Sequence, residues 1–169
     1  MNPLFLRHQT ELLYEIEIRG SAKFLLRTRE ALDLLRPTLF FPKIQRHVAI
    51  IKQGKRSGMK AYAKRPMFVV GKRTWSHSAL WYAGAIAHDS YHSKLYHDAK
   101  SISGKKPSAD FWTGSEAEKK CLAFQIEVLK TLGAGDETVA YLRELEKNPT
   151  YQGSNHGWRS WWNYWRRPW

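Results

Sequence analysis

The feature that most constrains this chain is a run of small and apolar residues leading into two histidines one helical turn apart. Residues 78–87 read SALWYAGAIA, and His88 and His92 follow at a spacing of four. At about 100° per residue, such positions lie within about 40° of each other on one face of a helix. The apolar composition predicts a buried helix, and buried polar side chains need partners. We therefore expect a metal site, because one ion can bind both imidazoles.

Two other histidines near this segment are not expected to bind the same ion. His97 follows His88 by nine residues, which places it about half a turn round the helix, on the opposite face. No glycine between Ser93 and Tyr96 would let the chain double back. His77 shares the face of His88 but lies about three turns away along the axis. The third ligand is therefore expected from another segment.

Residues 115–133 predict an amphipathic helix that carries the candidate third ligand. Its apolar positions recur at helical spacing: Cys121, Leu122, Phe124, Ile126, Leu129 and Leu132. Ser115 and Glu118 have the spacing of a capping box, so one interpretation of Glu118 is a carboxylate that caps its own helix. The other interpretation is that Glu118 reaches across to His88 and His92.

The sequence H-D-x-x-H on one buried helix, followed by E-x-x-small on the next, resembles the gluzincin pattern of zinc metallopeptidases. The resemblance covers residues 75–132. It implies a minimal zincin-like α+β fold, with a small, mostly antiparallel sheet packed on the metal-binding helix and further helices towards the C-terminus. It also implies one zinc ion per chain, bound by His88, His92 and Glu118.

Two glutamates at the start of the second helix are candidates for the third ligand, and the residues that follow each of them distinguish the two. With Glu118 as the ligand, Cys121 occupies the small position and Phe124 the aromatic one, as in the gluzincin pattern. With Glu116 as the ligand, Lys119 would occupy the small position. The resemblance therefore favours Glu118.

By the same resemblance, the chain would hydrolyse a peptide or amide bond in a peptide or protein substrate, through a metal-activated water. Asp89 stands where the family has a glutamate as general base, and its carboxylate is one methylene shorter. Tyr151 and His156 are candidates for contacts with the oxyanion or substrate. The alternative is a catalytically silent zincin fold that binds an anionic partner.

The positive charge of the chain is concentrated in one stretch. The formal net charge is +13, and residues 34–88 contain eleven Lys and Arg but no Asp or Glu. Such a block indicates an anionic partner, namely nucleic acid, another acidic polymer or a membrane surface. The alternative is a solvated basic surface. The candidate contact residues are Lys60, Lys64, Arg65, Lys72 and Arg73.

The remaining helices and strands are predicted from hydrophobic periodicity and from the residues that cap or end such elements. A strand or helix end is expected at 12–19, a helix at 22–36 capped by Ser21, and an apolar link at 39–42. Strands are expected at 47–52, 59–64 and 66–70, with 66–73 as the edge of the sheet beside the substrate cleft. Thr74 or Ser76 would cap the metal-binding helix, which would run to about Tyr96. A loop over 99–113 and a last helix capped by Asp136 complete the prediction.

We expect one domain over residues 1–149 and a tail over 150–169. Five of the eight tryptophans lie between Trp158 and Trp169, interleaved with arginines. Such a tail suits stacking on bases, a membrane interface, cation–π contacts or packing on the domain. Cys121 is the single cysteine, so no internal disulfide can form. No signal peptide or transmembrane segment is evident, and a cytoplasmic location is expected.

Overall fold

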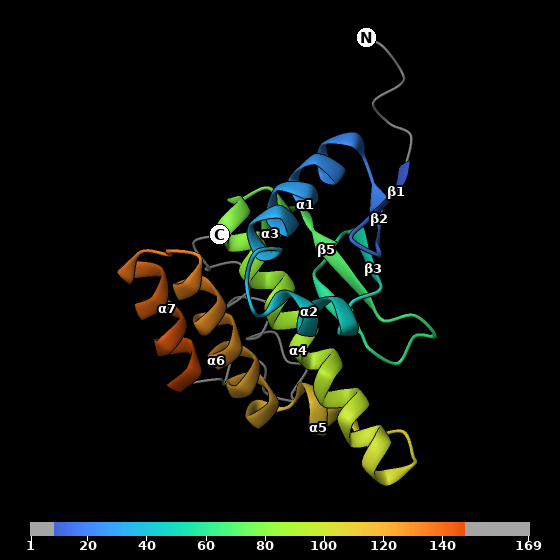
Figure 1. The fold of residues 1–169 in the computed structure, drawn as a ribbon. Coiled ribbons are helices and arrows are strands. Elements are labelled where there is room, and N and C mark those ends of the chain that lie inside the picture. Colours follow the sequence, from blue (N-terminus) through green and yellow to red (C-terminus); the bar gives the residue numbers. More distant parts are fainter. Residues whose placement is uncertain (1–8, 148–169) are drawn as a thin grey trace.

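A computed structural model describes residues 9–147 and arranges them as an α+β fold (Figure 1). Within these residues, five strands form one sheet in the order β1-β2-β3-β5-β4. The strands are β1 (Gln9–Leu13), β2 (Ile16–Gly20), β3 (Ile50–Gly54), β4 (Gly58–Lys60) and β5 (Met67–Gly71). The helices are α1 (Ala22–Leu35), α2 (Phe41–His47), α3 (Lys72–Trp75), α4 (Ala79–Ser103), α5 (Ala109–Thr113), α6 (Ser115–Thr131) and α7 (Asp136–Lys147). The predicted α+β class is confirmed.

The sheet is mixed rather than mostly antiparallel. Strands β2, β3 and β5 run parallel, and β1 and β4 pair antiparallel at the two edges. The prediction that residues 66–73 form the edge is wrong, because β5 lies between β3 and β4. The side chains of Phe68 and Val70 in β5 are fully buried, as expected for an inner strand. Strand β4 is short and ends at the exposed Lys60, as expected for an edge strand.

Residues 12–19, predicted as one strand or a helix end, contain a turn between β1 and β2. Tyr14 and Glu15 both have positive φ, 50° and 63°. Type I′ hairpin turns need such values at both central positions, which are usually Asn, Asp or Gly. The Tyr14 hydroxyl contacts Asp33 at 2.6 Å, and its ring packs edge-on against Phe41 at 5.8 Å. These contacts hold the unusual turn against α1 and α2.

Helices α1 and α4 cover one face of the sheet and bury its apolar side chains. Strands β2 and β5 alternate in burial, as expected when one face packs on helices. The buried cluster contains Ile16, Ile18, Ile51, Phe68 and Val70 from the sheet, and Phe24, Leu32, Tyr82 and Ile86 from the helices. Ser21 caps α1 as predicted, with its hydroxyl accepting from the Phe24 amide. Residues 39–42, predicted as a link, lead into α2, where Pro42 fits the first helical turn.

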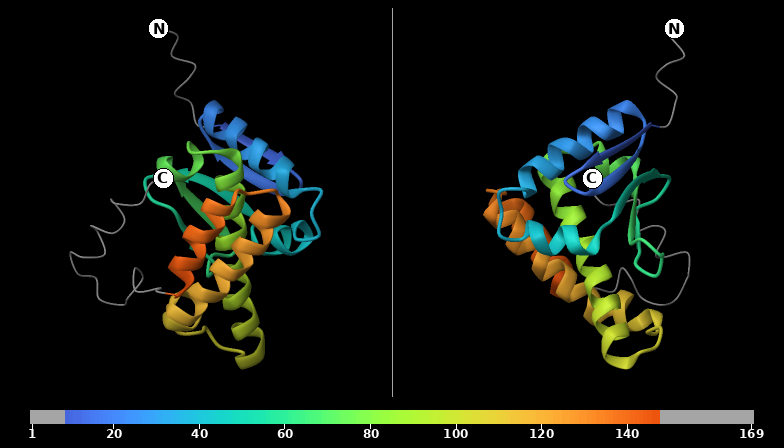
Figure 2. Two further views of the ribbon diagram at one scale, coloured as in Figure 1. Left: turned by 90° about the vertical axis from the view of Figure 1, so that its left-hand side faces the viewer. Right: turned by 45° about the vertical axis from the view of Figure 1, so that its right-hand side comes forward.

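The metal-binding helix of the prediction is α4, which begins later and ends later than expected. Ser78, rather than Thr74 or Ser76, caps it by accepting a hydrogen bond from the Trp81 amide. Gly104, at φ 65°, ends it well beyond Tyr96. Both views in Figure 2 show the C-terminal part of α4, coloured green to yellow, projecting past the sheet. The predicted loop over 99–113 is therefore partly helical.

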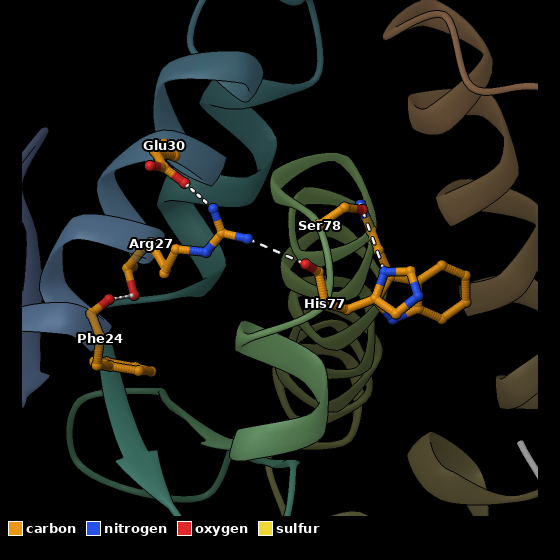
Figure 3. A network of polar contacts seen from close by, with 7 residues as sticks. Phe24, Arg27, Glu30, His77 and Ser78 are labelled. Atoms are coloured by element: carbon orange, nitrogen blue, oxygen red, sulfur yellow. Dashed lines mark hydrogen bonds and ion pairs between the residues drawn. The ribbon is translucent and has the colours of Figure 1, made fainter. Parts of the chain in front are cut away.

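An arginine of α1 holds the start of α4 in place (Figure 3). The Arg27 guanidinium contacts Glu30 at 2.6 Å and donates to the carbonyl of His77 at 3.1 Å. His77 itself is exposed, and its ring lies near the Ser78 hydroxyl. The predicted role of His77 outside the metal site therefore fits its position.

Helices α6 and α7 lie on the side of α4 away from the sheet (Figure 1). Gly84 allows close approach of α4 and α6, because a Cβ there would meet the Leu129 side chain at 2.9 Å. Helix α7 begins at Asp136, the residue that was predicted as its cap, and packs through Val139 and Leu142 on α6. This approach of α4 and α6 positions the candidate site.

Residues 148–169 lie outside the described part of the chain, so the domain boundary and the tryptophan-rich tail stay predictions. Among the helices of residues 9–147, none combines the length and the hydropathy that a bilayer crossing requires.

Candidate metal centre

Polar side chains from α4 and α6 meet in the buried interface between these helices. His88 and His92 lie one turn apart on α4, as their spacing predicts. Glu118, Cys121 and Gln125 recur on α6 at intervals of three and four residues, so they share one face of that helix. Glu118 is 1% exposed and Cys121 is fully buried. The site therefore lies between two helices, and the spacing of the polar residues along each helix places them on the face towards the other.

The histidine side chains and the glutamate carboxylate converge on one small space. The Nε2 atoms of His88 and His92 lie 3.1 Å apart. His88 Nε2 is 3.0 Å from Glu118 Oε1, and His92 Nε2 is 3.2 Å from Glu118 Oε2. The structure thus brings together the three residues that the sequence predicts as ligands.

The outer nitrogens of both imidazoles are held by acceptors from other elements. His88 Nδ1 donates to Gln125 Oε1 at 3.0 Å, and His92 Nδ1 donates to the carbonyl of Trp112, in α5, at 2.6 Å. With Nδ1 protonated, a neutral imidazole presents the lone pair of Nε2. Histidines that bind metals are commonly oriented in this way. Both Nε2 atoms therefore face the shared space as potential ligand atoms for a metal ion.

Cys121 brings a sulfur donor to the same place. One ligand atom each from His88, His92 and Cys121 lie within 4.8 Å of one another, a grouping that could hold a metal ion. Burial raises the pKa of the Cys121 thiol, and the nearby Glu118 and Asp89 carboxylates add to the rise. From the sequence alone, Cys121 is expected on the apolar face of this helix and at the small position three residues after Glu118, and not as a ligand.

The charges of His88 and Glu118 are strongly coupled. Burial disfavours the charged imidazole, but Glu118, with help from Asp89 and Gln125, outweighs it and raises the pKa of His88 to about 8. Burial also opposes ionisation of Glu118, yet the two imidazoles hold the pKa of that carboxyl far below its usual range. The centre therefore favours an ionised carboxylate that demands a positive partner, either a proton on an imidazole or a cation.

Asp89, the predicted base, lies beside this centre on α4. Burial raises the pKa of Asp89 to about 6, and the charge of Glu118 contributes to the rise, while His88 and His92 oppose it. A carboxyl with a pKa near neutrality suits proton transfer better than an ordinary aspartate, because the ideal pKa of a general base lies near the working pH.

The alternatives weighed for the third ligand occupy other positions. Glu116 is exposed and pairs with Lys119 at 2.7 Å. The capping-box interpretation of Glu118 is wrong, because Gly114 is the N-cap of α6 and the Glu118 carboxylate contacts the histidines instead. His97 lies on the far face of α4, as predicted, and stacks against His47 with ring centroids 6.3 Å apart.

The candidate contacts for an anionic partner lie at both ends of β5: Lys60, Lys64 and Arg65 are near its start, and Lys72 and Arg73 follow its end. Lys60, Lys64 and Lys72 are exposed, and Arg73 is partly buried. Arg65 instead forms an ion pair with Glu17 on β2. Because Arg65 is engaged by Glu17, which also pairs with Arg19, it is a weaker candidate than the lysines.

Besides the Cys121 sulfur, Gln125 and the Trp112 carbonyl were not found from the sequence, and two predicted residues lie beyond the described ones. Gln125 is seven residues after Glu118, the helical repeat that would have indicated it. The Trp112 carbonyl carries no sequence signal, because any residue has one. Tyr151 and His156 lie outside residues 9–147, so their predicted contacts are neither supported nor opposed.

The comparisons with known proteins returned no family model, no curated protein and no solved structure that matches this chain.

Proposed function

We propose that this protein is a zinc-dependent hydrolase of peptide or amide bonds, with His88, His92 and Glu118 as the metal ligands. The observation that supports this most is the convergence of both Nε2 atoms on one carboxylate, at 3.0 and 3.2 Å, inside a helix interface. Burying an ionised carboxylate is costly unless a positive charge, such as a metal ion, balances it.

The donor spacing fits a zinc ion. Nitrogen and oxygen ligands lie about 2.0–2.1 Å from zinc in tetrahedral geometry, which separates neighbouring donors by about 3.3 Å. The three separations in the centre, 3.0, 3.1 and 3.2 Å, are close to this value. Nitrogen donors and a carboxylate also match the ligands of catalytic zinc sites.

When bound, zinc supplies a Lewis acid that activates water and polarises a carbonyl group. Asp89 would accept the proton of the attacking water and return it to the leaving amine. Gln125 and the Trp112 carbonyl would orient the imidazoles through their Nδ1 atoms. The short side chain of Asp89 predicts slower proton transfer than a glutamate would give.

The test compares metal content and turnover in one series. Untagged protein, purified without added metal, is expected to contain one zinc per chain by elemental analysis. Asp89→Asn should retain zinc and lose turnover of a responsive peptide substrate. Asp98→Asn serves as the matched control, because Asp98 is exposed on the same helix and pairs with Lys94. Equal activity of wild type and Asp89→Asn would show that Asp89 is not the base.

A second candidate function is binding of single-stranded nucleic acid along edge strand β4. A groove of about 350 Å³ there is lined by Arg56, Lys60 and Tyr62, among others. Tyr62 is 57% exposed, and Lys106 lies over its ring at 5.7 Å. In residues 9–147, Arg56, Lys60 and Lys106 form no ion pair. Exposed cations around an aromatic ring suit phosphate contacts and base stacking.

This second function is tested by titrating single-stranded DNA at several salt concentrations. Affinity should fall with salt, with a log–log slope of about −0.7 per neutralised phosphate. The double variant Arg56→Gln/Lys60→Gln should flatten that slope, whereas Lys23→Gln/Lys130→Gln, with the same change in charge elsewhere, should not. Preferential binding of an acidic peptide, or salt-independent binding, would contradict it.

A further inference from the structure

We propose that Cys121 is a fourth donor of the same centre, so that two histidines, one carboxylate and one thiolate enclose the metal and exclude water. This inference rests on the proposed metal centre and concerns how that centre is regulated. If it holds, hydrolysis requires the sulfur to leave the metal.

The position of Cys121 on α6 directs it to the ligands. It follows Glu118 by three residues and therefore lies on the same face of the helix, towards α4. Its side chain is fully buried. Its sulfur and one ring nitrogen each of His88 and His92 lie within 4.8 Å of one another.

The distances and the chemistry are compatible with sulfur ligation. A Zn–S bond of about 2.3 Å beside a Zn–N bond of about 2.0–2.1 Å separates sulfur and nitrogen by about 3.6 Å in tetrahedral geometry. The donor atoms of His88, His92 and Cys121 lie within 4.8 Å of one another, a range that includes this separation. On binding the cation the thiol would release its proton to solvent, since thiolate is the ligating form.

The number of donors decides what the centre can do. Structural zinc sites have four protein ligands, whereas catalytic sites have three and leave one position for water. With Cys121 bound, the centre belongs to the first kind, and with Cys121 withdrawn, it belongs to the second. The competing interpretation is a core thiol, because Cys121 also packs in a buried cluster with Ala61, Leu95, Tyr96, Trp112 and Ala117.

Cobalt(II) distinguishes these interpretations without any assay of activity. Cobalt replaces zinc in such sites, and a thiolate ligand adds a sulfur-to-cobalt charge-transfer absorption in the near ultraviolet. Cys121 is the single cysteine of the chain, so that absorption has one possible source. Full-length wild-type protein, stripped of metal and titrated with Co²⁺, should show it together with the visible bands of tetrahedral cobalt.

The variants sharpen the result. Cys121→Ala should lose the charge-transfer absorption, keep visible bands from the remaining ligands, and bind Co²⁺ about tenfold more weakly or worse. Its turnover of a responsive peptide should exceed that of wild type, because a position opens for water. Cys121→Ser keeps the size of the side chain, so a packing defect in Cys121→Ala alone would be recognised by circular dichroism. The wild-type spectrum decides the question even if both variants misfold.

The outcomes separate this inference from the proposed function. Visible cobalt bands without charge-transfer absorption in wild type, and unchanged affinity in Cys121→Ala, would overturn the role of Cys121 and leave the three-ligand centre standing. A wild-type protein that binds no Co²⁺ at all would overturn the metal centre itself, and this inference with it.

Discussion

Two pairs of histidines meet at α4, one on each side of the helix. The rings of His88 and His92 lie 4.9 Å apart, beside a buried carboxylate and with acceptors at both Nδ1 atoms. The rings of His47 and His97 stack 6.3 Å apart. Burial lowers the pKa of both His47 and His97, whereas the carboxylate of Glu118 makes the pKa of His88 rise.

Proximity of two imidazoles is therefore not sufficient for a metal site. The first pair has a carboxylate to balance a cation and outer hydrogen bonds that direct both Nε2 atoms inward. The second pair is favoured as neutral rings, because desolvation is the largest influence on each. The neighbouring charges of Asp98, Lys94, Arg46 and Lys100 have opposing effects on it and do not supply a shared ligand.

The largest expected difference between the pairs is in metal binding. His92→Ala should abolish stoichiometric zinc, because it removes a ligand, and should remove the stabilisation that the ion provides. At a free zinc concentration of 100 times Kd, that stabilisation is about 2.7 kcal/mol. His97→Ala, the matched change on the other face of α4, should keep one zinc per chain. Elemental analysis and thermal unfolding measure both effects, and full zinc occupancy in His92→Ala would refute the assignment.

The second expected effect concerns the carboxylate that only the first pair has. Glu118→Gln should lower zinc affinity by more than the 10–100-fold typical of an outer partner, since it removes the charge of a ligand. Glu116→Gln changes an exposed residue that pairs with Lys119, and exposed ion pairs contribute little. Competition with a chromogenic chelator measures both affinities. If Glu116→Gln loses zinc while Glu118→Gln binds normally, the assignment of Glu118 as the third ligand is wrong.

The third expected effect tests the outer hydrogen bonds. Gln125→Leu removes the acceptor at His88 Nδ1 and should weaken zinc binding about 10–100-fold. Gln45→Leu is the control, because Gln45 contacts the Tyr14 carbonyl and Glu15, away from the centre. Equal affinity of the two variants would mean that Gln125 does not orient His88.

The smallest expected effect concerns the His47–His97 pair and the pH dependence of stability. Because the folded state lowers both pKa values below about 6.5, the unfolded chain binds more protons as the pH falls. The contribution of the pair is therefore present above pH 6.5 and lost progressively as the pH drops towards the lowered values. Denaturant unfolding of chelator-treated protein between about pH 7 and pH 5 should show a steeper loss in wild type than in His47→Gln/His97→Gln.

The effect should be small, because both rings are partly exposed. The exposed His77 provides the control: His77→Gln should follow wild type across the range. A double variant with the same pH dependence as wild type would show that the two rings do not resist protonation in the folded protein.

Several features could be predicted from the sequence because they depend on one helix at a time. The shared face of His88 and His92, the opposite face of His97 and the cap at Ser21 follow from residues close in the chain. The α+β class was predicted from the resemblance, and the expected strands and helices agree with it. Glu118 is different: its meeting with the histidines was predicted from a resemblance, not from periodicity.

Other features were decided only by how the elements pack. Strand order places β5 inside the sheet and β4 at its edge, although β5 was the predicted edge. The short α2 begins in the predicted link at 39–42 and ends at the first residue of the strand predicted at 47–52, and it brings His47 to His97. Gln125, Cys121 and the Trp112 carbonyl reach the histidines because α4, α5 and α6 meet there. A helix determines its own faces through its fixed turn per residue, but which face of another element it meets depends on contacts between residues far apart in the chain.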